Sequence, residues 1–309
     1  GRSQASLLKT VQLFQEYGAM DYTIVVAATG ADSANAQYLV PYTACALGEY
    51  FMFAGKHVFV VFDDLTRHAW AYRQIALLLE RAPGRESYPG DIFYIHSQMM
   101  ERAGKLKPDL GGGTMTFLPI IETIQGDFTG FIPTNLISIT DGQIYLETDL
   151  FNKGIRPAIN VGVSVSRVGS SAQTNAMKKV AGKLRLELAQ FRELEAFVQF
   201  SSDLDEDTKK RIEKGKLMVE VLKQDKNVPL PFEKQVALIF IASSGALDNA
   251  DKTRIAELET KFYALLESQY PQILKTIAET CDLSQESQDN LKEATESFKK
   301  THPEFFGGK

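Results

Sequence analysis

Cysteine and histidine are scarce in this sequence, and their scarcity argues against several kinds of site. Two cysteines, Cys45 and Cys281, occur far apart among the 309 residues. Two reduced thiols are the expected state, because disulfides are rare outside oxidising compartments. None of the four histidines has the spacing to a cysteine or to a second histidine that is typical of zinc ligands, so a zinc site is not expected.

Long apolar runs and an excess of positive charge are also lacking. The most apolar stretches, residues 23–28 and 58–62, have the length of strands, whereas a membrane-spanning helix needs about 20 residues. The net charge is -5 and the pI is about 5.6, whereas a nucleic-acid-binding domain usually carries a basic face. The composition therefore predicts a globular chain with no membrane span and no nucleic-acid partner.

The first part of the chain predicts an α/β architecture. Apolar residues recur there at helical spacing in some segments and run continuously in others. The expected helices are residues 7–17, 38–53 and 66–80, and the expected strands are residues 22–28, 57–62, 116–123 and 136–139. Continuous apolar strands that alternate with helices are typical of a parallel sheet covered on both faces.

The pattern changes near residue 173 and is helical almost throughout thereafter. The expected helices are residues 176–200, 205–223, 232–243, 252–267, 273–280 and 285–300. Lysine and glutamate cluster on their polar faces, and little strand signal remains. The predicted fold class is therefore α/β followed by all-α, with one domain over residues 1–173 and a second over residues 174–309.

Two adjacent acids, Asp63 and Asp64, follow the apolar run at residues 57–62. In phosphate-binding ATPases an acid at the carboxyl end of a buried strand holds magnesium, and ligands gather at that edge of parallel sheets. An aspartate here can equally cap the next helix. A Walker A loop occurs nowhere in the sequence. Either the chain is not an NTPase, or that loop precedes Gly1.

Two arginines, Arg156 and Arg167, flank a stretch of small, apolar and polar residues. A guanidinium on such a loop can reach across a subunit boundary and neutralise charge on a transferring phosphoryl group. The plainer alternative is a surface arginine that pairs with a carboxylate in a turn. Phe151 and Pro157 lie close to Arg156, and this combination can either stack on a purine or simply pack.

Several long motifs follow one another in a fixed order across nearly the whole chain. They are DDLTRHAWAYRQ at residues 63–74, RESYPGDIFY at 85–94, IPTNLISITDGQI at 132–144, PAINVGVSVS at 157–166 and EATESF at 293–298. Together they resemble the alpha subunits of F-type (rotary) ATP synthases. The resemblance implies a RecA-like nucleotide-binding domain without its Walker A loop, followed by a carboxy-terminal helical domain; the amino-terminal beta-barrel domain of the family would be missing.

The resemblance also implies a function within a larger complex. Alpha subunits of this family bind ATP or ADP with Mg²⁺ without turning it over, and they alternate with beta subunits in a ring around the gamma rotor, with a peripheral stalk outside. The complex couples ATP synthesis or hydrolysis to ion transport, on the cytoplasmic face of a bacterial plasma membrane or the equivalent face in an organelle. The alternative is a paralogous rotary-motor or structural subunit whose nucleotide site does not function.

Individual site residues are implied by the same resemblance. Arg167 would be the arginine finger that reaches into the beta-subunit site, and Ser138 would lie near that interface. Asp63 would lie beside the magnesium of the non-catalytic site. The adenine pocket would be lined by Phe151, Arg156, Pro157, Gln224 and Lys226. By itself, the fragment is not expected to hydrolyse ATP.

Several positions depart from the family pattern. Arg2 stands where the family usually has a glutamine near the gamma-phosphate, and an arginine there would change how the site holds ATP. Lys226 replaces a second glutamine, which puts its contact with adenine in doubt. His68 and Trp70 replace a glutamine and a small residue in the motif that begins at Asp63, and QMM at residues 98–100 replaces a more usual Arg-Leu-Leu. The match is therefore to a divergent member.

Overall fold

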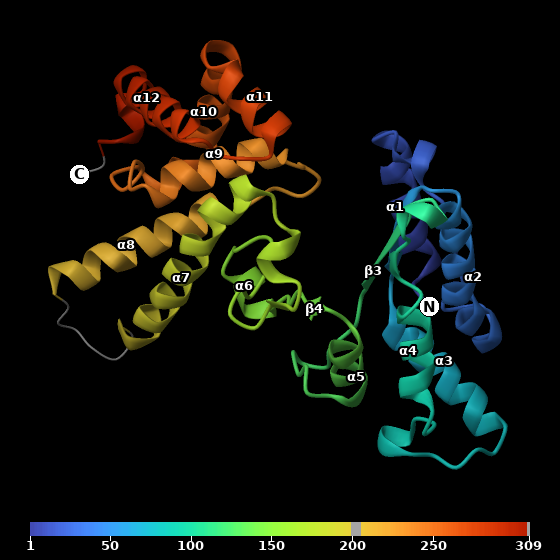
Figure 1. Cartoon of the computed structure of the whole chain (residues 1–309). Coiled ribbons are helices and arrows are strands. Elements are labelled where there is room, and N and C mark those ends of the chain that lie inside the picture. Colours follow the sequence, from blue (N-terminus) through green and yellow to red (C-terminus); the bar gives the residue numbers. More distant parts are fainter. Residues whose placement is uncertain (199–204, 308–309) are drawn as a thin grey trace. The chain divides into compact units, whose positions relative to one another are not determined.

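The computed structural model describes residues 1–198 and 205–307, and the chain forms two compact units (Figure 1). The first unit is Gly1–Asp141 and the second is Gly142–Lys309. The first holds a small sheet with helices, whereas the second is almost wholly helical. The fold class is therefore the predicted one, an α/β part followed by an all-α part.

The first unit is built from five helices and three strands. In chain order they are α1 (Gln4–Glu16), α2 (Ala34–Phe53), β1 (His57–Phe62), α3 (Leu65–Leu78), α4 (Ile92–Met100), β2 (Gly104–Lys105), β3 (Thr114–Pro119) and α5 (Phe131–Ile139). Short 3₁₀ turns lie at Ala19–Tyr22, Arg85–Ser87 and Pro108–Leu110.

The sheet of this unit has the strand order β1-β3-β2. Strands β1 and β3 are parallel with His57 opposite Thr114, and the two-residue β2 adds to β3 antiparallel. Helix α2 packs closely on this sheet because residue 48 is glycine: a Cβ atom there would lie 2.7 Å from Sδ of Met115. The parallel pair puts the carboxyl end of β1, and hence Asp63, at one edge of the sheet.

Two predicted strands are wrong. Residues 23–29 have no regular secondary structure and pair with no strand in the described part of the chain, and Tyr22 ends a 3₁₀ turn with its side chain 83% exposed. An apolar run becomes a strand only when a neighbouring strand supplies hydrogen bonds to its backbone. Residues 136–139 form the last turn of α5. They were predicted as a strand because a short apolar run has no periodicity that separates strand from helix.

The sheet is also less enclosed than predicted. Strand β1 was expected to be buried on both faces, yet its exposure alternates, with Phe59 64% and Val61 48% exposed. The side chains on the opposite face, such as Phe62, pack into a core with the helices. In the described structure one face of β1 is therefore covered and the other faces outward.

Capping side chains mark where several helices begin. Ser33 accepts a hydrogen bond from the backbone of Ala36 at the start of α2, and Asp64 accepts one from Arg67 at the start of α3. Asp205 does the same for α8. Each oxygen satisfies a backbone N–H that has no partner within its own helix, which stabilises the helix by about 1 kcal/mol.

The second unit contains one short strand pair and seven helices among its described residues. Its elements are β4 (Gly142–Gln143), α6 (Thr148–Asn152), β5 (Val165–Ser166), α7 (Asn175–Val198), α8 (Glu206–Val221), α9 (Phe232–Ser243), α10 (Ile255–Gln269), α11 (Pro271–Thr280) and α12 (Gln285–Thr301), with 3₁₀ turns at Gly169–Ala172, Lys252–Arg254 and Pro303–Phe305. The six long helices predicted here are confirmed to within a few residues, apart from the predicted end of α7, which lies outside the described residues.

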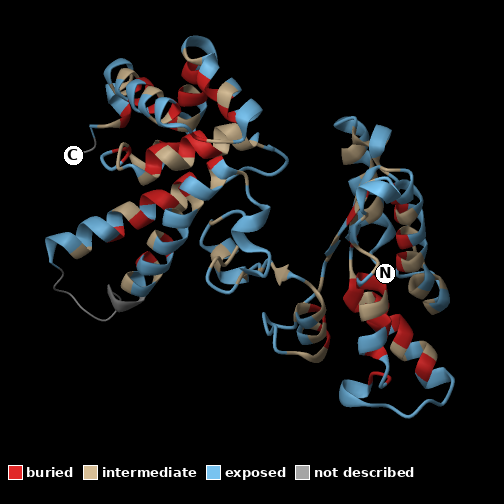
Figure 2. Ribbon diagram, viewed as in Figure 1, coloured by how far each residue is buried: buried red, intermediate tan, exposed pale blue. Residues whose placement is uncertain are grey.

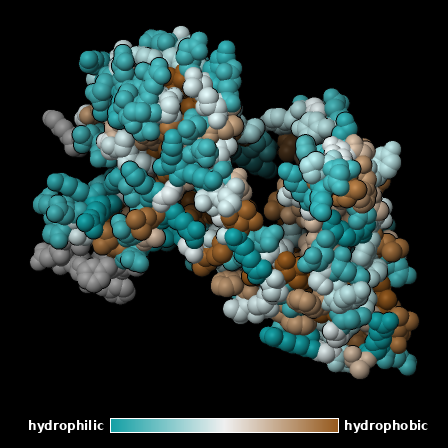
Figure 3. All heavy atoms as spheres, viewed as in Figure 1, coloured by the Kyte–Doolittle hydropathy of each residue, from teal (hydrophilic) through white to brown (hydrophobic). Residues whose placement is uncertain are grey.

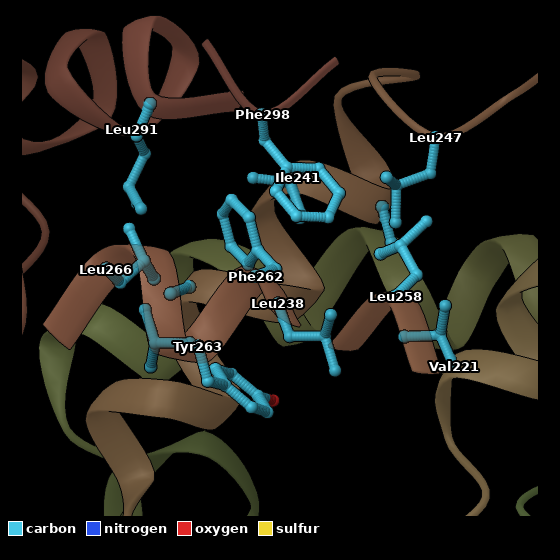
Figure 4. Packing of buried hydrophobic residues seen from close by; sticks show 14 of the residues in the cluster. Val221, Leu238, Ile241, Leu247, Leu258, Phe262, Tyr263, Leu266, Leu291 and Phe298 are labelled. Carbon is cyan, nitrogen blue, oxygen red and sulfur yellow. The ribbon is translucent and has the colours of Figure 1, made fainter. Parts of the chain in front are cut away.

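Helices α7 to α12 enclose one hydrophobic core (Figures 2 and 4). Phe262 and Phe298 meet edge to face at its centre, with ring centroids 5.5 Å apart, and both are fully buried. Leu258 and Leu266 lie one turn to either side of Phe262 on α10 (Figure 4). Burial of large apolar side chains at helical spacing is what holds these amphipathic helices together.

The surface of the helical unit is mostly hydrophilic in the view of Figure 3, whereas the first unit shows more apolar side chains. None of the helices within residues 1–198 and 205–307 is both long enough and apolar enough to cross a membrane. The division into compact units falls after Asp141, because residues 142–173 pack on the helices that follow them. The domain boundary near residue 173 stays a prediction.

Candidate functional site

Asp63 follows β1 directly and is paired with an arginine. Nε of Arg2 donates to Oδ1 of Asp63 at 2.8 Å, and the Asp63 side chain is 42% exposed. This hydrogen bond raises the pKa of Arg2 above its usual range. Asp64 is the residue that caps α3, and its side chain is 4% exposed. Of the two adjacent acids, Asp63 is therefore the one that can reach an external ligand.

The exposed carboxylates near the end of β1 set limits on the metal that this edge of the sheet could hold. Besides Asp63, Glu122 is 55% exposed and is paired with Arg67. The described residues contain no group of three or more His, Cys, Asp or Glu side chains that could bind a metal ion. Mg²⁺ usually keeps several waters and takes one or two carboxylates together with phosphate oxygens. Asp63 therefore fits a magnesium ion held largely through a nucleotide, and it does not fit a metal site made wholly by protein.

Phe151, Arg156 and Gln224 lie together in the second unit. The guanidinium carbon of Arg156 is 4.3 Å from the centre of the Phe151 ring, a stacked cation–π arrangement. The backbone N–H of Gln224 donates to the carbonyl of Arg156 at 2.9 Å. The segment just after α8 therefore lies beside the segment after α6, although about 70 residues separate Gln224 from Arg156 in the sequence. Phe151 is 50% exposed, so its ring remains accessible.

Pro157 and Lys226 belong to the same region. Pro157 follows Arg156 through a cis peptide bond and is exposed. Lys226 is exposed in the loop after α8, and that loop is closed by a hydrogen bond from Nε2 of Gln224 to the carbonyl of Val228 at 2.6 Å. The structure therefore gathers four of the five predicted adenine-pocket residues through direct contacts or adjacency, with Lys226 in the loop beside them.

Arg167 is exposed and comes directly after β5. Strand β5 pairs antiparallel with β4, with Ser166 opposite Gly142. The close approach requires glycine, because a Cβ at residue 142 would lie 2.2 Å from the carbonyl oxygen of Val165. After the arginine, the chain turns where the N–H of Gly169 donates to Oγ of Ser166. The arginine is thus carried at the end of a tightly paired strand.

Ser138 is exposed in the last turn of α5, where its Oγ donates to the carbonyl of Asn135 at 2.7 Å. Asp63 and Ser138 belong to the first unit, whereas Arg167 and the Phe151 group belong to the second. The predicted site residues therefore form separate groups, each defined within its own unit.

The comparisons with known proteins agree with these elements. Residues 1–166 match the family described as "ATP synthase alpha/beta family, nucleotide-binding domain", and residues 173–298 match "ATP synthase alpha/beta chain, C terminal domain". The chain belongs to the ATP synthase alpha/beta family.

Within this family the chain is similar to alpha subunits. It is 55% identical over 299 residues to the ATP synthase subunit alpha of Aquifex aeolicus, 54% identical over 298 residues to that of Petrotoga mobilis and 53% identical over 301 residues to that of Dehalococcoides mccartyi. These alignments cover 96–97% of this chain and 59–60% of the relatives. The chain thus spans about three-fifths of the length of these alpha subunits.

The sequence analysis of this ATP synthase family chain did not single out Asn160 or Arg192, which the structure brings together. Asn160 lies in the loop before Arg167, and its Oδ1 accepts hydrogen bonds from Nη1 of Arg192 and from the N–H of Gly162. Its Nδ2 donates to Oε2 of Glu147 at 2.7 Å. Asn160 is part of the motif at residues 157–166, but no sequence pattern joins it to Arg192 on α7, 32 residues later.

A cavity of about 450 Å³ lies elsewhere in this ATP synthase family chain. It is lined by residues of α2, of α3 and of the segment after α3, among them Tyr38, Tyr72 and Leu79. It includes none of the predicted site residues, and its position is therefore no guide to the nucleotide site.

Proposed function

We propose that this chain is the nucleotide-binding but non-catalytic alpha subunit of an ATP synthase catalytic head, and that Arg167 acts in trans on the site of a neighbouring beta subunit. The observation that carries the proposal is the exposed arginine at the end of the β4–β5 pair. A guanidinium held in this way can neutralise the charge that develops on a transferring phosphoryl group, which contributes about 10³ to 10⁵ in rate. Ser138 would face the same interface.

The chain's own nucleotide site would take ATP or ADP with Mg²⁺. Phe151 would stack on adenine, with Arg156, Pro157, Gln224 and Lys226 around the ring. Asp63 would hold the magnesium, which neutralises phosphate charge when it is bound. Support comes from the stacked Arg156–Phe151 pair, the hydrogen bond that joins Gln224 to Arg156, and the exposure of Asp63.

The proposed partners follow from the same role. Beta subunits would alternate with this chain in a ring around the gamma rotor, with the peripheral stalk outside, and the ring would couple ATP synthesis or hydrolysis to ion transport. The assembly would sit peripherally on the cytoplasmic face of a bacterial plasma membrane, or on the equivalent side in an organelle. The domain division proposed for this role is residues 1–173 and 174–309.

The test is an ATPase assay on the full-length parent, assembled with beta and gamma subunits. Arg167→Ala is expected to lower turnover by about 10³-fold or more while nucleotide affinity changes little. Arg211→Ala is the matched control, because Arg211 is also an exposed arginine of the second unit, on α8. If the ring that carries Arg167→Ala assembles normally and turns over ATP at the parent rate, the proposed role of Arg167 is wrong.

A second candidate is favoured by one observation. Arg2 pairs with Asp63, the acid proposed for magnesium, and so places a fixed positive charge where the metal would bind. The alternative is therefore a paralogous rotary-motor or structural subunit whose nucleotide site does not function. Equilibrium binding of Mg-ATP to the full-length chain distinguishes the two: binding supports the first candidate, and absence of binding supports the second. Restoration of binding by Arg2→Gln would identify Arg2 as the cause of the loss.

A further inference from the structure

We propose that Asn160 and Arg192 are positioning residues for Arg167, and that they fix the loop of the arginine to helix α7 of the helical part. The proposal rests on the proposed function for its consequence in the reaction, while the local arrangement stands on the hydrogen bonds of the second unit alone. Arg192 lies 25 residues beyond Arg167 in sequence and belongs to a different element.

The side-chain amide of Asn160 is satisfied at both ends. Its oxygen accepts from Arg192 and, at 2.9 Å, from the N–H of Gly162, while its nitrogen donates to Glu147 at 2.7 Å. A flipped amide would present a donor to two donors and an acceptor to a carboxylate, so the amide has one permitted orientation. A cation and an anion at opposite ends strengthen both bonds, because charge-assisted hydrogen bonds are roughly twice as strong as neutral ones.

Backbone hydrogen bonds of Asn160 continue this network toward Arg167. Its carbonyl accepts from Oγ of Ser164 at 2.6 Å and from the N–H of Ser164 at 3.0 Å, and its own N–H donates to the carbonyl of Tyr145 at 2.9 Å. Oγ of Ser164 in turn accepts from the N–H of Tyr145 at 3.0 Å. The loop is therefore closed on the segment that follows β4, and β5 begins at the residue after Ser164.

The helical part holds the loop at further points. Val161, next to Asn160, packs against the hydrophobic core of helices α7 to α12. Gln224, just after α8, is bonded to the carbonyl of Arg156. The segment from residue 156 to residue 166 is thus anchored at its start by Gln224 and in its middle by Val161 and Arg192. Hydrogen bonds to residues 143–147 hold the same segment, among them one from the N–H of Glu147 to the carbonyl of Ala158 at 2.9 Å. Its last two residues pair with β4, after which the chain reaches Arg167.

This arrangement matters because transition-state stabilisation depends on position. A misplacement of about 1 Å in a charged group can cost about 100-fold in rate. Loss of the Arg192 hydrogen bond would leave Asn160 and Gly162 held by fewer contacts, and the strand that carries Arg167 would sample more positions. The rate would fall, whereas the substrate, which Arg192 does not touch, would bind as before.

The activity test uses the full-length chain assembled with its beta and gamma subunits. Arg192→Ala is expected to lower kcat by about 10- to 100-fold with KM unchanged, and Arg192→Lys should recover much of the loss because a lysine can still donate to Asn160. Arg185→Ala, an exposed arginine on the same helix, is the matched control and should leave kcat unchanged. Equal losses in the Arg192→Ala and Arg185→Ala rings would overturn the proposal.

A double-mutant comparison asks whether Arg192 acts through Arg167. If it does, Arg192→Ala should cost nothing further in a ring that already carries Arg167→Ala, because the group it positions is gone. Independent, multiplied losses would show that Arg192 acts by another route, and would overturn the positioning role even if Arg167 is essential. If Arg167→Ala alone leaves turnover normal, the proposed function fails first.

A second pair of variants tests the local claim without the reaction. Asn160→Asp keeps the acceptor for Arg192 but sets two carboxylates against each other at Glu147, and Glu147→Gln in the same chain restores a donor. Amide hydrogen exchange over residues 158–166 of the full-length chain should speed up about 10-fold in Asn160→Asp and return toward the parent rate in the double variant. Unchanged exchange in Asn160→Asp would refute the network itself, whatever the ring assays give.

Discussion

His68 and His96 form a buried pair in the first unit. Nδ1 of His68 lies 3.3 Å from Nε2 of His96, and His68 stacks on Tyr38 with ring centroids 5.2 Å apart. Both rings are almost wholly buried. Burial lowers the pKa of His68 to about 4, and burial with the neighbouring ring lowers the pKa of His96 to about 3. Both imidazoles are therefore neutral near neutral pH.

The pair predicts that acid destabilises the first unit before its carboxylates titrate. In the unfolded chain each histidine protonates near pH 6.5, whereas in the fold it does not until about pH 4 or 3. The unfolded state thus binds more protons in this window. The contribution of the two histidines to the free energy of unfolding is therefore complete above pH 6.5 and decreases as the pH falls. The slope should approach about 1.4 kcal/mol per pH unit for each histidine.

Urea unfolding followed by tryptophan fluorescence measures this directly, since the single tryptophan, Trp70, lies in the same unit. Between pH 6.5 and 5, His68→Gln should remove about half of the slope, because the amide can still bond to His96 but carries no proton to titrate. His57→Gln, at an exposed histidine of that unit, is the control substitution. A parent chain with no slope in this window would contradict the prediction.

At the scale of elements, helices α7 and α8 approach each other through a glycine. A Cβ on Gly215 would lie 2.2 Å from Cγ of Phe191, a buried side chain of α7. Cβ of Phe191 would also lie only 2.5 Å away, and a change of rotamer does not move that atom. A Cβ on Gly182 of α7 would meet nothing within 4 Å.

One substitution should therefore have opposite effects at these two glycines. Gly215→Ala is expected to destabilise the helical unit by about 1–3 kcal/mol through overpacking. Gly182→Ala should stabilise it by about 0.5–1 kcal/mol, because alanine is the better helix former and space is open. Denaturant unfolding followed by circular dichroism measures both. Two changes of the same sign would mean that α7 and α8 do not pack in this way.

The elements that could be predicted from the sequence are those whose pattern is long. Helices such as α9 (Phe232–Ser243) carry several turns of periodic apolar residues and were located correctly. Residues 22–28 were misassigned because an apolar run does not specify its partner strand. Residues 136–139 were misassigned because four apolar residues suit either structure, and helix α5 is decided by the residues before them.

Some contacts of the candidate site could likewise be predicted from the sequence, and others could not. Phe151 and Arg156 are close in sequence, so their stacking could be anticipated, and the resemblance to ATP synthase alpha subunits supplied Gln224 from far away. The Asn160–Arg192 bond could not be found from the sequence, because its partners lie on a loop and on a helix and neither has a distinctive pattern. Such a contact depends on how α7 packs, which is a property of the folded unit.

At the scale of the whole chain, two hydrophobic cores are distinct. One includes Cys45, Ile92 and Leu136 of the first unit, and the other includes Leu258 and Phe298 of the second. Among residues 1–198 and 205–307, none belongs to both cores. Since burial of apolar surface is the main favourable contribution to folding, each unit holds its own source of stability.

Separate cores predict separate unfolding transitions. Phe298→Ala removes a fully buried ring of the second core and should cost that core about 3–5 kcal/mol. Circular dichroism, to which the long helices contribute most, should then show an earlier transition, whereas the Trp70 fluorescence transition should not move. Ile92→Ala, in the first core, should do the reverse, with a loss of about 2–5 kcal/mol seen by Trp70. If either substitution shifts both transitions equally, the two units unfold as one cooperative body, which would contradict the prediction of separate transitions.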